Sequence, residues 1–297
     1  MVNNILKTRN GVNVLLNRGS KATPDYTIPS TFKVSIDTSD VTWVDTSLST
    51  TVPITGTESV DDCSVTTGWT ASGSNSVAVN TVTFKPDGGT DGSLTLIKSD
   101  VSSATVSVAK TVTSLDGTSK DLLTWIYVID AAALAKISSS SIRYGSDSSN
   151  YYLIAITLSV GWNFIKTAIT SGFDSTVGSP VIGSLDYYYF DMVTNNATDT
   201  FSSGDIIFDS IRLASVDDYL KTIETDLIID ETDGSVSTIS KLSVSEANGF
   251  LINGHGIFNT DSSPKMTDTG KFASYSKGTT DLFKFTNKVK LRNVNQT

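Results

Sequence analysis

Short runs in which hydrophobic and polar residues alternate with a period of two recur along this chain, which predicts β-strands. Serine, threonine, valine and isoleucine dominate the alternating runs, and clusters of glycine, serine and aspartate separate them. In the middle of the chain the expected strands cover residues 93–98, 105–111, 122–129, 141–144, 151–158, 162–169, 186–193 and 205–213. This succession of strands with short links predicts an all-β fold, with a β-sandwich of the jelly-roll kind.

Other segments depart from this pattern or add to it. A short helix is expected at residues 130–136, where Asp130 precedes an alanine-rich run and can cap it. The first part of the chain offers strands at residues 12–16 and 32–36, followed by an irregular arm at 45–52. Residues 282–292 predict a strand with one apolar face, of Phe283, Phe285, Val289 and Leu291, and one basic face, of Lys284, Lys288, Lys290 and Arg292.

The two ends of the chain are each too short for a convincing sandwich. We therefore expect residues 1–58 and 217–297 to form together a second, smaller β-rich domain. The jelly roll of residues 59–216 is then inserted into that domain, because the two ends of a compact module usually lie close together and tolerate insertion.

Composition and charge exclude several classes of protein. The 297 residues are 38% hydrophobic, which is typical of a globular chain. No apolar run approaches the roughly 20 residues of a membrane-spanning helix, and the first residues lack the apolar core of a signal peptide, so neither membrane insertion nor export by a standard leader is expected. The net charge of −9 argues against a nucleic-acid surface. A single cysteine, Cys63, and a single histidine, His255, exclude an internal disulfide framework and a zinc site of the Cys/His kind.

An ordered series of motifs runs through residues 59–216. They are Val-Asp-Asp-Cys-Ser from Val60, Gly-Trp-Thr-Ala-Ser-Gly from Gly68, Asp-Gly-Ser-Leu-Thr-Leu from Asp91, Leu-Thr-Trp-Ile-Tyr-Val-Ile-Asp from Leu123, Ile-Arg-Tyr-Gly-Ser-Asp from Ile142, Gly-Trp-Asn-Phe-Ile-Lys from Gly161 and Ile-Ile-Phe-Asp-Ser-Ile-Arg-Leu from Ile206. In this order the segment resembles the galactose-binding-like jelly rolls found as carbohydrate-binding modules, especially those inserted into phage virion proteins.

The two ends of the chain resemble the scaffold of tailed-phage structural proteins. The matching stretches are Pro-Ser-Thr-Phe-Lys-Val from Pro29, Val-Ser-Glu-Ala-Asn-Gly-Phe from Val244, Gly-Ile-Phe-Asn from Gly256 and the closing strand at 283–291. The resemblance implies a virion structural protein, either a capsid decoration or a tail- or fibre-associated protein, assembled in the host cytoplasm. Its expected partners are other virion proteins, further copies of itself and a surface glycan bound for host attachment. The alternative is a purely structural decoration protein that binds no glycan.

The resemblance also implies one structural calcium ion. In such modules calcium commonly lies where the first strand, a glycine-rich turn and an acid on the last strand meet. The matching residues here are Asp61, Asp62, Asp87, Asp91, Gly92 and Asp209. Calcium takes about six to eight oxygen ligands, which such a loop can supply. The alternative is that the glycines only provide tight turns and the aspartates only solvate the ends.

Aromatic residues are the candidates for binding sugar, because sugars stack their C–H faces on aromatic rings beside polar groups. Arg143, Tyr151, Tyr187, Tyr189 and Trp125 are the candidate residues. The alternative places these rings in the core, as is usual for aromatics on strands, and we favour it for Trp125 and Trp162.

Catalysis is not expected. The four glutamates Glu58, Glu224, Glu231 and Glu246 lie outside the jelly-roll segment, and the usual nucleophile, phosphate-loop and zinc-protease motifs are missing. We expect His255, between glycines, to be a turn residue. The basic strand at 284–292 has three interpretations: contact with nucleic acid, which the acidic chain disfavours, contact with an acidic neighbouring subunit, which we favour, or protection of a sheet edge.

Overall fold

The computed structural model describes residues 4–7, 9–37, 45, 47–85, 92–230, 235–248, 250–277, 280 and 282–290. Regular structure in these residues is nearly all β-strand, which confirms the predicted fold class. The chain divides into two compact units. We call Gly56–Val216 the sandwich unit, and Met1–Thr55 together with Asp217–Thr297 the flanking unit. The domain boundaries that the sequence predicts, at 58/59 and 216/217, stay a prediction.

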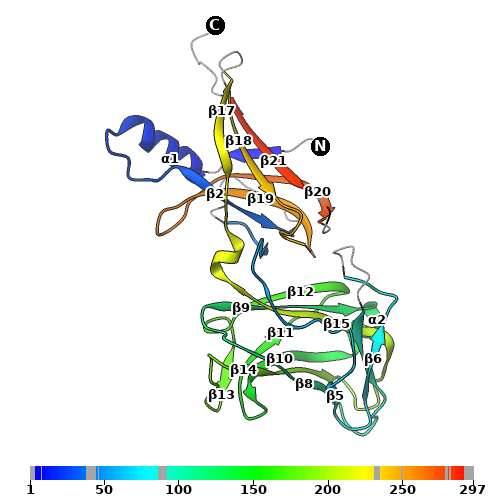
Figure 1. Ribbon diagram of the computed structural model, residues 1–297. Helices are drawn as coiled ribbons and strands as arrows, with labels where there is room; N and C mark the ends of the chain where they lie inside the picture. The colour runs from blue at the N-terminus through cyan, green and yellow to red at the C-terminus, as the bar shows by residue number, and fades with distance from the viewer. Residues whose placement is uncertain are drawn as a thin grey trace. The chain divides into compact units, whose positions relative to one another are not determined.

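The sandwich unit is built from two antiparallel sheets (Figure 1). The first sheet has the order β13-β11-β10-β14-β8-β5, and the second has the order β12-β9-β15-β7-β6 with β4 beside β15. The strands of the first sheet are β5 (Thr70–Ala71), β8 (Thr105–Leu115), β10 (Ile137–Asp147), β11 (Asn150–Ile156), β13 (Ser175–Val177) and β14 (Leu185–Thr194). Those of the second are β4 (Glu58–Asp61), β6 (Ser76–Asn80), β7 (Ser93–Lys98), β9 (Lys120–Val128), β12 (Gly161–Ala168) and β15 (Phe201–Ser215).

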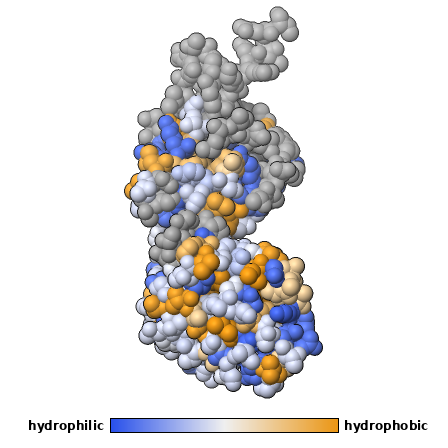
Figure 2. Space-filling model, turned by 90° about the vertical axis from the view of Figure 1, so that its right-hand side faces the viewer, coloured by the Kyte–Doolittle hydropathy of each residue, from blue (hydrophilic) through white to orange (hydrophobic). Residues whose placement is uncertain are grey.

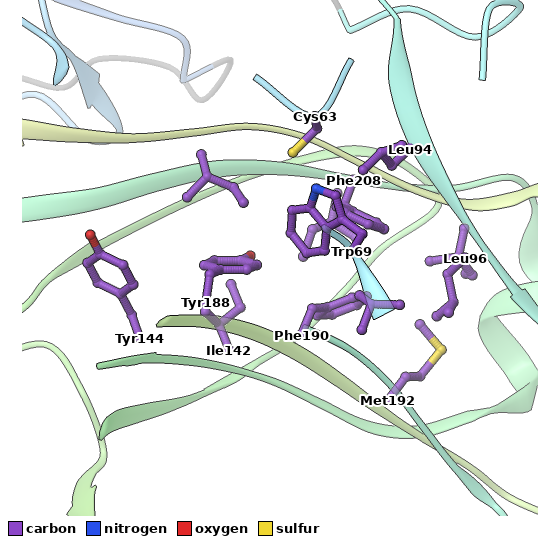
Figure 3. Packing of buried hydrophobic residues seen from close by; sticks show 14 of the residues in the cluster. Cys63, Trp69, Leu94, Leu96, Ile142, Tyr144, Tyr188, Phe190, Met192 and Phe208 are labelled. Atoms are coloured by element: carbon purple, nitrogen blue, oxygen red, sulfur yellow. The ribbon is translucent and has the colours of Figure 1, made fainter. Parts of the chain in front are cut away.

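The core of this unit is a cluster of buried hydrophobic residues from strands of both sheets, which pack against one another between the sheets. Tyr188 and Phe190 of β14 face Phe208 of β15, and Trp69 lies among them (Figure 3). The Trp69 ring centre is 6.0 Å from that of Tyr188, edge-on, and 5.0 Å from that of Phe208. Rings packed in this way add attraction to the burial of apolar surface.

The predicted short helix is confirmed as α2 (Ala131–Lys136). Asp130 has extended backbone geometry, and its Oδ1 accepts a hydrogen bond from the Ala133 N–H at 2.7 Å. This bond satisfies one of the amide groups that have no partner within the first turn of a helix.

The flanking unit contains two further sheets. One has the order β1-β20-β19-β2-β16, with β3 beside β2, and the other has the order β17-β18-β21. Their strands are β1 (Asn4–Lys7), β2 (Pro29–Ser35), β3 (Thr51–Val52), β16 (Lys221–Thr222), β17 (Glu224–Asp230), β18 (Ser235–Leu242), β19 (Leu251–Asn259), β20 (Met266–Ser276) and β21 (Phe283–Lys290). A helix, α1 (Arg9–Ser20), packs on β20, and a 3-10 turn, η1 (Val216–Tyr219), begins at the end of the sandwich unit.

The strand expected at residues 12–16 is wrong, because these residues belong to helix α1. Gly11 lies so close to β20 that a Cβ atom there would be 2.0 Å from the Thr267 carbonyl oxygen, and Val14, three residues on, is buried. Gly11 and Val14 therefore lie on the same side of helix α1, as residues three positions apart in a helix do. Over five residues, a helical and a strand-like apolar pattern cannot be distinguished. The irregular arm expected at 45–52 ends in strand β3.

The expectation that His255 is a turn residue is also wrong. His255 lies in strand β19 and is fully buried, with its ring centre 4.6 Å from that of Phe285 and 6.3 Å from that of Phe272. The adjacent glycine serves close packing in the strand, since a Cβ at Gly256 would lie 3.0 Å from the Met266 sulfur.

The closing strand, β21, shows the predicted alternation where its side chains are described. Phe283 and Phe285 are buried, whereas Lys284 and Thr286 are exposed. Leu291 and Arg292 of the predicted strand lie outside the described residues. No helix in the described parts of the chain combines the length and apolarity that crossing a membrane requires.

Replacing Phe208 by alanine tests the packing between the two sheets. Phe208 is fully buried, so we expect the variant to lose about 3–5 kcal/mol of unfolding free energy. Urea unfolding followed by tryptophan fluorescence measures this, because Trp69, Trp125 and Trp162 all lie in the sandwich unit. The matched control is Val82→Ala, 83% exposed, which is expected to change stability by less than about 0.5 kcal/mol. Equal effects of the two substitutions would contradict the assigned core.

Candidate functional site

Three tyrosines and one arginine share the outward face of the first sheet. Arg143 of β10 pairs in register with Tyr189 of β14, while Gly145, two residues on, pairs with Tyr187 on one side and Tyr151 on the other. The intervening residues, such as Tyr144 and Tyr188, point into the core. Because side chains alternate along a strand, the arginine and the three tyrosines point away from the core. We call Arg143, Tyr151, Tyr187, Tyr189 and Asp191 the tyrosine face.

Arg143 lies between two of the rings. Its guanidinium carbon is 4.5 Å from the ring centre of Tyr189 and 5.1 Å from that of Tyr151. Tyr187 extends the aromatic surface, with its ring centre 6.1 Å from that of Tyr189 and the ring planes 34° apart. A cation over an aromatic ring is attracted by the negative ring face, which holds the arginine side chain against both tyrosines.

Asp191 forms an ion pair with the same guanidinium group. Its Oδ2 lies 2.6 Å from Nη2 of Arg143, and its Oδ1 accepts a hydrogen bond from the Ser107 hydroxyl at 2.7 Å. The Arg143 side chain is 29% exposed and that of Asp191 only 8%. Burial raises the pKa of the Asp191 carboxyl above its usual value, although Ser107 and Arg143 act in the opposite direction. The charge of the face is therefore compensated inside it, and the tyrosine rings provide most of its contact surface.

Gly145 determines how closely β10 and β11 approach at this face. A Cβ atom there would lie 2.2 Å from the Asn150 carbonyl oxygen and 2.5 Å from Cα of Tyr151. Only glycine allows this approach, which brings Tyr151 to Arg143. Sequence reasoning missed Gly145, Asp191 and Ser107. The period of two in 186–193 was a signal for Asp191, because it places Asp191 on the same face as Tyr187 and Tyr189.

Trp125 does not join the tyrosine face, because its strand, β9, belongs to the second sheet. It is 6% exposed and contacts Phe164 and Trp162, at ring-centre distances of 4.9 and 6.3 Å. Tyr127 also packs on Trp162, at 5.3 Å. Trp125 is thus buried, as we favoured, but it lies outside the cluster between the two sheets.

Small groups of apolar residues are scattered among polar ones on the side of the molecule that Figure 2 shows. The large apolar residues that are exposed in the sandwich unit are mostly valines, such as Val82 and Val101. Scattered exposed apolar residues are normal for a protein surface.

Segments from three parts of the chain meet where the calcium ion is predicted. Asp61 of β4 pairs in register with Ile211 of β15, and a Cβ atom at Gly92 would lie 3.3 Å from the Ser64 carbonyl oxygen. Asp87 and Asp91 lie outside the described residues.

The described carboxylates at this corner have other partners. Asp61 accepts a hydrogen bond from the Cys63 N–H at 2.8 Å and pairs with Lys110 Nζ at 2.6 Å. Asp209 pairs with Lys85 Nζ at 3.2 Å, with side chains 3% and 11% exposed.

Asp62 accepts hydrogen bonds from the backbone and hydroxyl of Ser64, at 3.1 and 2.9 Å, and these bonds lower the pKa of the Asp62 carboxyl. No group of three His, Cys, Asp or Glu side chains suited to a metal occurs in the described part of the chain. The described side chains therefore do not by themselves fit calcium, which stays a prediction that depends on Asp87 and Asp91.

Comparison with known proteins finds similarity in solved structures alone. No protein-family model and no curated protein matches the chain. The family 11 carbohydrate-binding module from Clostridium thermocellum, solved with a β-1,3-1,4-mixed-linked tetrasaccharide, has 14% sequence identity and a TM-score of 0.39, and the match covers 54% of this chain and 96% of that one.

Two other solved structures are similar to the same degree. An exo-β-agarase has 14% identity and a TM-score of 0.40, over 53% of this chain and 24% of that one. A xylan-binding domain of carbohydrate-binding module family 22 has 15% identity and a TM-score of 0.31, over 55% of this chain and 95% of that one. Likeness of this degree says nothing about the ligand of this chain.

Calcium added to the chelator-treated full chain tests the predicted ion. We expect it to raise the melting temperature, because a ligand bound only by the native state stabilises that state. The increase should vanish in Asp209→Asn and persist in the control Asp147→Asn, whose carboxylate accepts hydrogen bonds from Ser149 and Asn150 in an exposed turn. Equal melting temperatures with calcium and with chelator would contradict the prediction. The charges of Asp61 and Asp209 would then be balanced by Lys110 and Lys85.

Proposed function

We propose that the sandwich unit is a carbohydrate-binding module that holds a glycan on its tyrosine face. The observation that carries this proposal is the placement of three tyrosine rings around one fixed arginine on the outward side of a sheet. The apolar C–H faces of a sugar pack on such rings, while the tyrosine hydroxyls and the guanidinium exchange hydrogen bonds with sugar hydroxyls.

The rigidity of the arginine favours binding. Two rings and one carboxylate already hold Arg143, so a ligand does not have to order a free arginine side chain. The entropy lost on ordering flexible side chains ordinarily weakens association. A pre-arranged arginine therefore contributes its hydrogen bonds at a lower cost.

Binding without hydrolysis is the activity that this face supports. Glycoside hydrolysis ordinarily uses two carboxyl groups on either side of the scissile bond. Asp191 is the one carboxylate in the tyrosine face as we define it, and it is paired with Arg143 and hydrogen-bonded to Ser107.

We further propose that the chain is a phage virion structural protein, on the capsid or with the tail or fibre, which displays this module for attachment to a host or surface glycan. The support is the order of motifs in the flanking unit, from Pro29, Val244 and Gly256. Assembly in the host cytoplasm beside other virion proteins is part of the same proposal. Display in many copies suits a weak single site, because avidity multiplies weak binding.

Tyr189→Ala tests the glycan site. The full chain is first screened on an array of glycans, and the affinity of variants for the retained glycan is then measured by calorimetry. We expect a loss of about tenfold or more, equivalent to about 1.4 kcal/mol, because the variant removes both the stacking surface and one wall of the arginine site. Arg143→Lys should also weaken binding, since an ammonium lacks the planar fork of the guanidinium.

The matched control is Tyr127→Ala, a half-buried tyrosine on the second sheet. It should leave the affinity unchanged. Equal losses in both tyrosine variants would contradict the assigned face. If the chain binds no glycan while particles carrying it still adsorb to their host, the purely structural alternative is supported instead.

A further inference from the structure

The two outer strands of the three-stranded sheet in the flanking unit carry opposite charge. Strand β17, Glu-Thr-Asp-Leu-Ile-Ile-Asp, contains three acidic residues and no basic residue. Strand β21, Phe-Lys-Phe-Thr-Asn-Lys-Val-Lys, contains three lysines and no acidic residue. In the part of the chain that the structure describes, β17 and β21 each pair with β18 alone.

The two outer strands run in the same direction and are level with one another. Both are antiparallel to β18. Ser235 of β18 pairs with Asp230 on one side and Lys290 on the other. Ser237 likewise pairs with Ile228 and with Lys288. An acidic position at one edge thus lies in the same row as a basic position at the opposite edge.

We propose that β21 of one copy pairs in parallel with β17 of a second copy, so that this sheet continues from copy to copy. Without any stagger between the copies, the continuation places Lys290 beside Asp230 of the second copy. Opposite charges directly across neighbouring strands stabilise the pairing, and the backbone hydrogen bonds of the two edges are satisfied together. This inference is independent of the proposed glycan site.

The charges select this arrangement over a two-fold dimer. Pairing β21 with β21, or β17 with β17, would bring lysines against lysines or acids against acids, which destabilises cross-strand pairs. Pairing of unlike edges is head-to-tail, so it produces a closed ring when the rotation closes and a helical filament when it does not.

Protection of the edges against association is the competing explanation. Lysines on an edge strand are a common means of preventing unwanted pairing. Protection would be served by the same charge on both edges, because copies would then repel one another at every combination of edges. Here the unlike edges attract, which favours a specific contact between copies.

The exposed side of β21 is compatible with this contact. Lys284 and Thr286 are exposed, whereas Phe283 and Phe285 are buried. Glu224 of β17 already pairs with Lys241 of its own copy at 3.3 Å. The other acidic positions of β17 are Asp226 and Asp230, and β21 carries Lys288 and Lys290 beside Lys284.

Sedimentation velocity of the full chain tests the proposal. The unaltered protein is expected to form oligomers whose size grows with concentration and falls at high salt, because salt screens exposed charges. Two variants reverse one edge each: Lys288→Glu with Lys290→Glu, and Asp226→Lys with Asp230→Lys. Each variant alone should be monomeric, since its two edges then carry charge of the same sign.

An equimolar mixture of the two variants should recover the oligomer, because each reversed edge then meets an edge of opposite charge. A chain carrying all four substitutions should recover it too, which shows that the altered strands still fold. The charge-matched control is Lys21→Glu with Lys265→Glu, outside this sheet, and it should assemble as the unaltered protein does.

Three outcomes would overturn the inference. The first is an unaltered protein that stays monomeric at every concentration. The second is a reversed variant that still assembles. The third is a mixture that remains monomeric although the circular dichroism of both variants is native. None of these outcomes bears on glycan binding.

Discussion

Burial of every second side chain of β10 and β14 between the two sheets is the constraint on which the candidate site depends. Tyr144, Tyr188 and Phe190 are fully buried in the core. Because side chains alternate along a strand, this burial forces Arg143, Tyr187 and Tyr189 onto the outward side. A shift of one residue in either strand would exchange the two sets and expose the core rings. The same packing free energy that holds the sandwich together therefore orients the binding surface.

Buried or partly buried lysines connect segments of the sandwich unit in this acidic chain. Lys98 is 1% exposed, and its Nζ donates hydrogen bonds to the backbone carbonyls of Asp100, Ala197 and Asp199 at 2.7–2.8 Å. Lys110 and Lys85 form ion pairs with the carboxylates of Asp61 and Asp209. Removing one partner of such a buried ion pair leaves an uncompensated charge in the protein interior, which lowers the free energy of unfolding. These lysines join loops and strands that are distant in the sequence.

Much of the fold could be predicted from the period of two. The strands at 93–98, 162–169 and 186–193 match β7, β12 and β14 within one residue at each end, because alternation over six to eight residues favours a strand. The helix at residues 12–16 could not be predicted, since the contact between Gly11 and Thr267 that favours it joins distant parts of the chain. The glycines on both sides of His255 predict a turn from the sequence, but glycines also suit crowded strands, and only the packing around β19 distinguishes the two.

The candidate site was predictable in part for the same reason. Alternation indicates which tyrosines share a strand face, but it does not show which strands are neighbours. Arg143 meets Tyr189 because β10 pairs with β14, and Trp125 is elsewhere because β9 lies in the other sheet. Such pairing depends on packing throughout the unit, and no local pattern contains it.

Gly145 has a consequence for how this surface can evolve or be engineered. The tyrosines around it can be exchanged one at a time, since each projects from the sheet and its replacement alters only local contacts. Any side chain at position 145 would instead separate β10 from β11 and move Tyr151 away from Arg143. Ligand preference can therefore change gradually as individual tyrosines are replaced. The spacing between Tyr151 and Arg143, in contrast, depends on a glycine that cannot be replaced without separating the strands.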